Sequence, residues 1–171
     1  MFRSKMIKPD GRKSILILTV IWMVVIFLFS TQPAEKSTET SLFIGQLVEA
    51  VCVPGFLNLS PEEKRVMAED IDFVVRKTAH ATEYAILGAL LCMTVGEFLT
   101  LPEFRRYRLA YILGTLYAVT DEIHQLFVPG RSCMLVDVFI DSAGVLAGVL
   151  AVYVLKKITE KVICRKRLSV A

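Results

Sequence analysis

Four long apolar stretches, separated by blocks of charged residues, limit what this chain can fold into. They cover about residues 14–30, 76–101, 109–128 and 136–155, and each is close to the ~20 residues that a helix needs to cross a hydrocarbon layer of about 30 Å. A soluble domain would scatter its charged residues, 22% of this chain, among the apolar ones. The pattern predicts an all-α integral membrane protein, a four-helix bundle formed as one domain by residues 1–171.

The first stretch has an alternative reading as a signal peptide, because it is short and follows several basic residues. A cleavage site with small residues at positions −3 and −1 does not follow it, since Ala34 has Gln32 at the −3 position. The stretch is therefore interpreted as a retained helix.

The basic residues predict the orientation of the spans. Fourteen of the 20 lysines and arginines lie in the N-terminal tail, in the loop between the second and third spans, and in the C-terminal tail. Cytoplasmic segments are enriched in these residues. Both termini are therefore expected in the cytoplasm. The segment between the first two spans, and the loop between the last two, are then extracytoplasmic.

The extracytoplasmic segment, residues 31–75, carries signals of its own. Ser60 and Glu63 are spaced as a capping box, and Pro61 occupies the first helical position. Apolar residues follow at helical spacing, which predicts an amphipathic helix on the membrane surface that leads into the second span. A shorter apolar stretch at residues 42–53 also suits the interface. Cys52 and Cys133 fall on this same outer side, which allows a disulfide between them, although spacing alone does not establish one.

Polar residues within the spans are the main functional signal, because charges inside a membrane are costly and commonly mark sites. They occur at the end of the first span, the start of the second, the end of the third and the start of the fourth, and all of these fall in the outer half of the membrane. We expect them to converge on one outward-facing pocket. The candidate ligand-binding residues are Arg76, His80, Glu83, Asp121, Glu122, His124, Gln125, Arg131, Asp137 and Asp141.

Helical spacing places these residues on shared faces. On the fourth span, Asp137 and Asp141 continue into Gly144 and Gly148, a track of small residues on which another helix can pack closely. A purely structural interpretation remains for several of them. Asp137 suits a helix N-terminus, Lys77 suits the membrane interface, and the histidine–acid pairs suit hydrogen bonding between helices.

The segments RKTAHATEY (76–84) and DEIHQLFVPGR (121–131), the Ser/Gln end of the first span and the aspartate–glycine track resemble the VanZ-like family of membrane proteins. The resemblance runs from about residue 29 to 148, with Ala81 departing from the aromatic residue common at that position. It implies a single VanZ-like transmembrane domain in the bacterial envelope and a link to teicoplanin, a lipid-tailed glycopeptide antibiotic. It does not imply a mechanism.

Three functions are compatible with these observations. The first is an envelope protein whose pocket binds or modifies a lipid-linked or cell-wall ligand and lowers glycopeptide susceptibility. The second is a membrane-embedded enzyme, with a divalent metal as one option, since two histidines and several carboxylates suit a mixed nitrogen and oxygen site. The third is a scaffold that recruits partners. No cofactor motif is evident. Membrane lipids are the expected partners, nucleic acid is not expected, and the catalytic residues, metal ligands and oligomeric state are left open.

Overall fold

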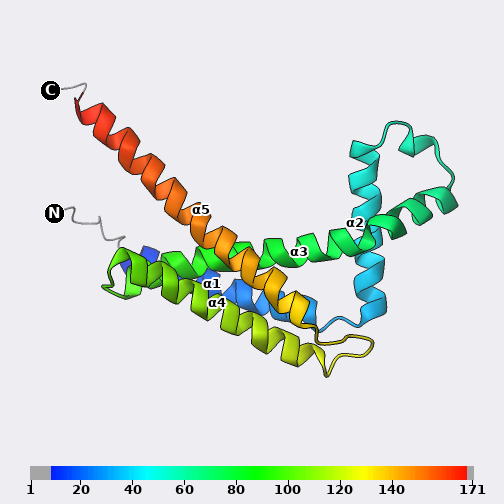
Figure 1. Cartoon of the computed structure of the whole chain (residues 1–171), viewed down its shortest axis with the longest axis horizontal. Coiled ribbons are helices and arrows are strands. Elements are labelled where there is room, and N and C mark those ends of the chain that lie inside the picture. The colour runs from blue at the N-terminus through cyan, green and yellow to red at the C-terminus, as the bar shows by residue number, and fades with distance from the viewer. Residues whose placement is uncertain (1–8, 169–171) are drawn as a thin grey trace.

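The protein is helical throughout the part of the chain that its structure, a computed structural model, describes, residues 9–168. No strand occurs in this part. Figure 1 shows the five α-helices and one short 3-10 helix, whose bounds are α1 (Pro9–Ser30), α2 (Ala34–Cys52), η1 (Phe56–Asn58), α3 (Pro61–Phe98), α4 (Glu103–Gln125) and α5 (Leu135–Leu168).

The start of α3 follows the capping signals in the sequence. The Ser60 hydroxyl accepts a hydrogen bond from the backbone N–H of Glu63, and the Glu63 carboxylate accepts one from the backbone N–H of Ser60 at 2.8 Å. From this cap α3 runs for 38 residues without a break, a length of about 57 Å. The expected amphipathic helix and the second apolar stretch are thus one continuous helix.

The central helix of the fold is α3, which packs against α1, α2, α4 and α5. Its closest neighbour is α5, and glycines allow this approach. A Cβ atom on Gly148 would lie 1.8 Å from the carbonyl oxygen of Ala85, and one on Gly144 would lie 2.3 Å from that of Ala81. Gly88 of α3 faces α5 in the same way. The small-residue track expected on the fourth span is therefore a helix-packing surface.

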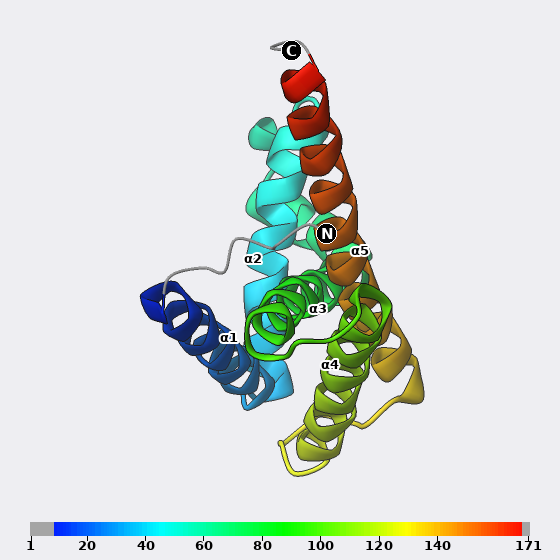
Figure 2. The ribbon, with the colours of Figure 1, turned by 90° about the vertical axis from the view of Figure 1, so that its left-hand side faces the viewer.

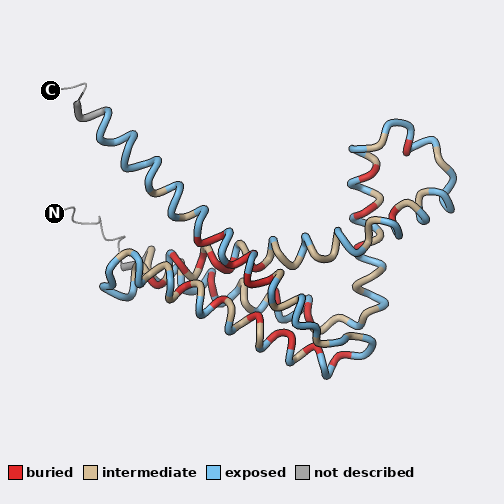
Figure 3. The backbone as a smooth tube through the Cα atoms, viewed as in Figure 1, coloured by how far each residue is buried: buried red, intermediate tan, exposed pale blue. Residues whose placement is uncertain are grey.

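The core lies where α1, α3, α4 and α5 meet. Tyr84, Leu87 and Val145 are fully buried there. Hydrogen bonds tie α1 to its neighbours: the Tyr117 hydroxyl donates to the carbonyl of Met23 at 2.7 Å. In end view, α1 and α4 lie on different sides of α3 (Figure 2). Figure 3 shows the buried residues gathered along this region, whereas the C-terminal half of α5 is mostly exposed.

The α2 helix crosses the N-terminal half of α3 (Figure 1). At the crossing, Gly45 of α2 packs on Ala68 of α3. A Cβ atom added to Gly45 would lie 3.4 Å from the Ala68 Cβ. The sequence indicated only a short apolar stretch in this region. The structure forms a 19-residue helix whose polar side contributes to the site described below.

Within residues 9–168, three helices are long and apolar enough to cross a membrane: α1, α3 and α5. The third apolar stretch of the sequence lies in α4, which is not among the three. Its last turns contain Asp121, Glu122 and Gln125, which lower its mean hydropathy, although all three side chains are buried.

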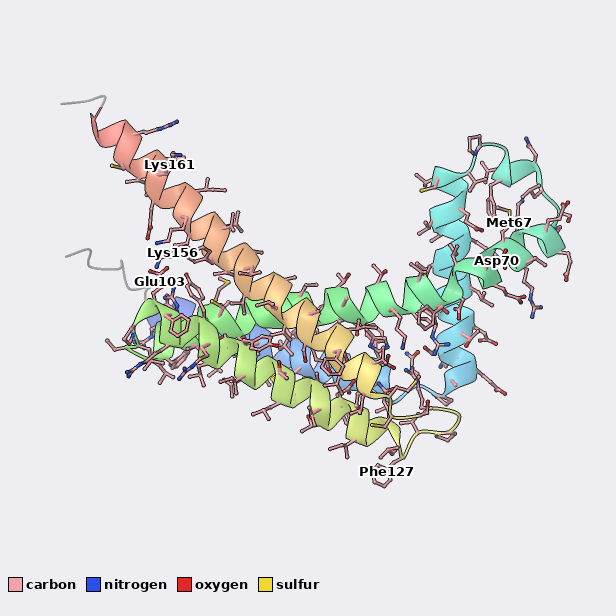
Figure 4. All side chains as sticks on the ribbon, in the orientation of Figure 1. Met67, Asp70, Glu103, Phe127, Lys156 and Lys161 are labelled. Atoms are coloured by element: carbon pink, nitrogen blue, oxygen red, sulfur yellow. The ribbon has the colours of Figure 1, made fainter. Side chains whose placement is uncertain are left out.

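The end of the molecule near Glu103 brings α4 and α5 together. The Lys156 ammonium lies 3.0 Å from the Glu103 carboxylate, which lowers the pKa of Glu103, and Figure 4 shows the two side chains side by side. The four cysteines are free, so Cys52 and Cys133 form no disulfide.

Candidate functional site

The polar segments singled out in the sequence meet at the opposite end of the helix cluster from Glu103. They come from the turn between α1 and α2, the middle of α3, the end of α4, and the loop that leads into α5. The backbone N–H of Ala34 donates to the carbonyl of Pro129 at 3.2 Å, which joins two of these segments. Gly130 follows with a φ of 74°, a conformation that glycine adopts readily, and reverses the chain toward Arg131.

A cavity of about 220 Å³ lies at this end. Four of the ten candidate residues line it: Arg76, His80 and Glu83 of α3, and Arg131 from the loop. The three residues of α3 share one helix face because they stand at i, i+4 and i+7. The rest of the wall is formed by α2 and by the end of α1, including the side chains of Gln32, Ser37, Thr40 and Ser41.

The two arginines in this cavity have different partners. The Arg131 Nε donates to the backbone carbonyl of Gln32 at 3.2 Å, and no carboxylate in the described part of the chain forms an ion pair with Arg131. The Arg76 guanidinium donates to the Thr38 hydroxyl at 3.2 Å and lies 3.7 Å from Asp72. Burial, followed by the positive charge of Arg76, lowers the pKa of Arg131. The two guanidinium groups therefore share one partly desolvated site.

A second layer of the site consists of buried acids. Asp121 is 4% exposed, and it accepts a hydrogen bond from Gln125 and lies next to the hydroxyls of Ser30 and Tyr84. The Glu122 carboxylate accepts a hydrogen bond from the backbone N–H of Met134 at 3.0 Å, and this bond fixes the loop before α5.

Asp141 differs from these acids because it lacks partners. It is 1% exposed, and neither carboxylate oxygen has a hydrogen-bond partner among the described residues. A buried carboxylate without such partners is destabilising. Residues that cost stability in this way often have a functional role, so Asp141 is a strong candidate for one.

The remaining candidates lie at the margins of the cluster. Lys77 forms an ion pair with Asp137, which joins α3 to the first turn of α5. The His124 ring packs against Phe27 of α1, with their centroids 4.7 Å apart. These contacts are structural, but they are not the ones expected from the sequence: Lys77 and Asp137 form a helix-to-helix pair, and His124 packs on an aromatic ring in the α1–α4 interface.

Sequence reasoning missed part of the cavity wall. The hydroxyl residues of α2 were not selected because no helix was expected to cross α3 at this place. Asp72 was also missed, although its position four residues before Arg76 is the spacing of an ion pair on one helix face. The ion pair that Arg76 forms is with Asp72, which is not one of the candidate residues.

Among residues 9–168, the structure shows no group of three or more histidine, cysteine, aspartate or glutamate side chains placed to hold a metal ion. The two histidines, which the metal-dependent alternative would bring into one site, have different surroundings: His80 lines the cavity and His124 packs on Phe27.

Comparison with known families shows which family the chain belongs to. The model of the VanZ/LLP1 family matches residues 15–156, which is most of the chain. The chain belongs to this family. As a VanZ/LLP1 family member with three helices able to cross a membrane, it is a membrane protein. The matched range contains every candidate site residue. Neither the curated proteins nor the solved structures yield a match to this chain.

Proposed function

We propose that this VanZ/LLP1 family member is a bacterial envelope protein whose polar cavity opens to the outer side of the membrane and binds an anionic ligand of the cell envelope. The observation that carries the proposal is the pair of guanidinium groups, Arg76 and Arg131, on one partly buried cavity wall. Arginine presents a planar fork of donors that suits phosphate and carboxylate groups. The hydroxyl groups of α2 would add neutral hydrogen bonds to the same ligand.

The proposal includes a bundle of four membrane spans, with α4 as the third. At 23 residues α4 is long enough to cross. Its polar residues Asp121, Glu122 and Gln125 are buried in the protein, so they do not face lipid and need not prevent insertion. With four spans and the basic residues on the cytoplasmic side, both termini are cytoplasmic, and the cavity and the segment with α2 are extracytoplasmic.

Lowered susceptibility to lipid-tailed glycopeptides is the phenotype that family membership suggests for this protein. We expect expression in a susceptible host to raise the inhibitory concentration of teicoplanin severalfold, and that of an untailed glycopeptide less. Arg131→Ala, Glu83→Gln and Asp121→Asn should each remove the protection, because the first two change the cavity wall and the third changes the buried acids behind it.

The matched control is Arg65→Ala, which removes an exposed arginine paired with Glu69, away from the cavity. This variant should protect as well as the wild-type protein, and all variants must be present in the membrane at equal levels. If the cavity variants also protect fully, the polar cluster stabilises the bundle and binds nothing. If the wild-type protein gives no protection, resistance is not its role, and the binding experiment below decides whether the cavity holds an anion.

A further inference from the structure

A second cavity lies beside the polar one and is almost entirely apolar. It has a volume of about 620 Å³ and lies between α1, α2 and α3. Its wall includes Trp22 of α1, Val48 of α2 and Val74 of α3, and most of its residues are apolar. Several of these apolar side chains are strongly exposed, Val74 at 62% among them. In a membrane, this opening between helices faces the lipid.

The two cavities share a wall. Phe29, Ile44, Val75, Ala79 and Glu83 line both of them. A single molecule that occupied both would have a polar end and an apolar end.

The charged residues of the polar cavity determine which charge the polar end of such a ligand should have. Arg76 and Arg131 stand against one carboxylate in the cavity wall, Glu83, and His80 is the other titratable group there. With His80 neutral, the wall has an excess of one positive charge. Asp72 offsets part of the Arg76 charge at 3.7 Å, and Asp121 and Glu122 behind the wall offset part of the Arg131 charge. Among the described residues, the hydrogen bond of Arg131 goes to the backbone carbonyl of Gln32 and not to an acid. The cavity is therefore suited to an anion, and the guanidinium pair is suited to a phosphate group.

We infer that the ligand is a phosphorylated lipid, with its phosphate between Arg76 and Arg131 and its hydrocarbon chain in the apolar cavity between α1, α2 and α3. The inference rests on the proposed function, and it specifies the ligand class. The lipid would enter sideways from the membrane, because the apolar cavity opens between helices. Ala79 and Glu83 line both cavities, so the phosphate group and the hydrocarbon chain of the lipid would join beside these two residues.

The chain provides its own reporter for this ligand. Trp22 lines the apolar cavity and is the single tryptophan of the protein. Its indole N–H donates to the backbone carbonyl of Glu83 at 2.9 Å, so it is fixed at the border of the two cavities. Bromine atoms on a lipid chain in the apolar cavity would contact this indole ring and quench its fluorescence.

The experiment titrates the purified full chain in uncharged nanodiscs with a long-chain alkyl phosphate brominated along its chain. We expect saturable quenching of Trp22 by this probe, and weak, unsaturated quenching by the brominated alcohol of equal length. Arg131→Ala should weaken binding of the phosphate probe about tenfold or more, since a hydrogen bond to a charged group contributes about 1.5–3 kcal/mol. Ala79→Phe, which fills the shared wall, should abolish saturable quenching.

The control for Ala79→Phe is Ala151→Phe, which makes the same change at an exposed position of α5 outside both cavities. It should leave the titration unchanged. Calorimetry with methyl phosphate separates the two claims. If methyl phosphate binds in an Arg131-dependent way but the brominated probe quenches no better than the alcohol, the lipid inference is overturned and the anion site stands. If Arg131→Ala alters neither measurement, the proposed function fails as well.

Discussion

At the residue scale, the buried acids of the site differ in how many polar partners they have. Asp121 has polar neighbours on three helices, and Glu122 holds a backbone N–H, whereas Asp141 is enclosed with neither oxygen bonded to a described residue. Placing one more carboxylate among these acids costs free energy, and natural proteins keep such costs mainly where function needs them. Stability and activity should therefore respond in opposite directions to the removal of this charge.

For Asp141→Asn, we expect the thermal unfolding midpoint in detergent to rise, by the equivalent of about 1 kcal/mol, because a neutral amide avoids the free-energy cost of burying a carboxylate or of protonating it. Protection or ligand binding should fall in the same variant. Asp70→Asn is the control, because Asp70 is an exposed residue of α3 (Figure 4) that lines neither cavity. A lower midpoint for Asp141→Asn would mean that the carboxylate contributes to folding instead.

At the element scale, the fold depends on how closely α3 and α5 approach. Their contact places Gly144 and Gly148 directly on the backbone of α3, so no side chain fits between them. The same approach sets the position of the functional residues. Asp137 and Asp141 stand on α5 just before the glycine track, and Arg76, His80 and Glu83 stand on α3 just before its counterpart. Separating the two helices would therefore disturb the site as well as the core.

Gly148→Leu should prevent this approach and destabilise the protein by about 3 kcal/mol or more, since overpacking against a rigid backbone cannot be relieved by a rotamer change. Ala147→Leu introduces the same side chain at the neighbouring, exposed position and should be tolerated. The measurement is the fraction of monodisperse protein after heating, by size-exclusion chromatography in detergent. Equal behaviour of the two variants would show that the α3–α5 contact is looser than described.

At the scale of the whole molecule, the two ends of the helix cluster differ in charge. Among the described residues, one end carries Arg12 at the start of α1, Arg106 at the start of α4 and the Glu103–Lys156 pair. The other end carries the cavity and the buried acids. An asymmetry of this kind orients a membrane protein, because basic segments are retained in the cytoplasm.

Reporter fusions test this orientation. Fusions after Ser4, Glu63, Glu103, Ser132 and Val170 should report cytoplasm, outside, cytoplasm, outside and cytoplasm in turn; the first and last positions lie outside the described residues. A cytoplasmic signal at Glu63 would place the cavity on the inner side and overturn the envelope ligand. A cytoplasmic signal at Ser132, with the other signals unchanged, would show that α4 and α5 do not both cross.

The sequence by itself determined the helical class, the membrane character, the family and the glycine track on α5. Each of these is encoded locally, in hydropathy, in spacing along one helix, or in contiguous motifs such as the segments 76–84 and 121–131. The cap at Ser60 is equally local, and it forms as predicted. The convergence of the polar segments at one end followed from alternating span directions, and the structure brings Arg76, His80, Glu83 and Arg131 to one cavity.

Only the tertiary structure decided which partners these residues have. The crossing of α2 over α3 brings Gly45 onto Ala68, a contact between residues 23 positions apart that no periodicity reveals. That crossing supplies Thr38 to Arg76 and creates both the polar wall and the apolar cavity beside it. Likewise, Asp121 and Asp141 are both acids on apolar helices, but their different neighbours are set by packing between helices. Spacing along a helix determines which residues share a face, whereas the packing of several helices determines which residues that face contacts.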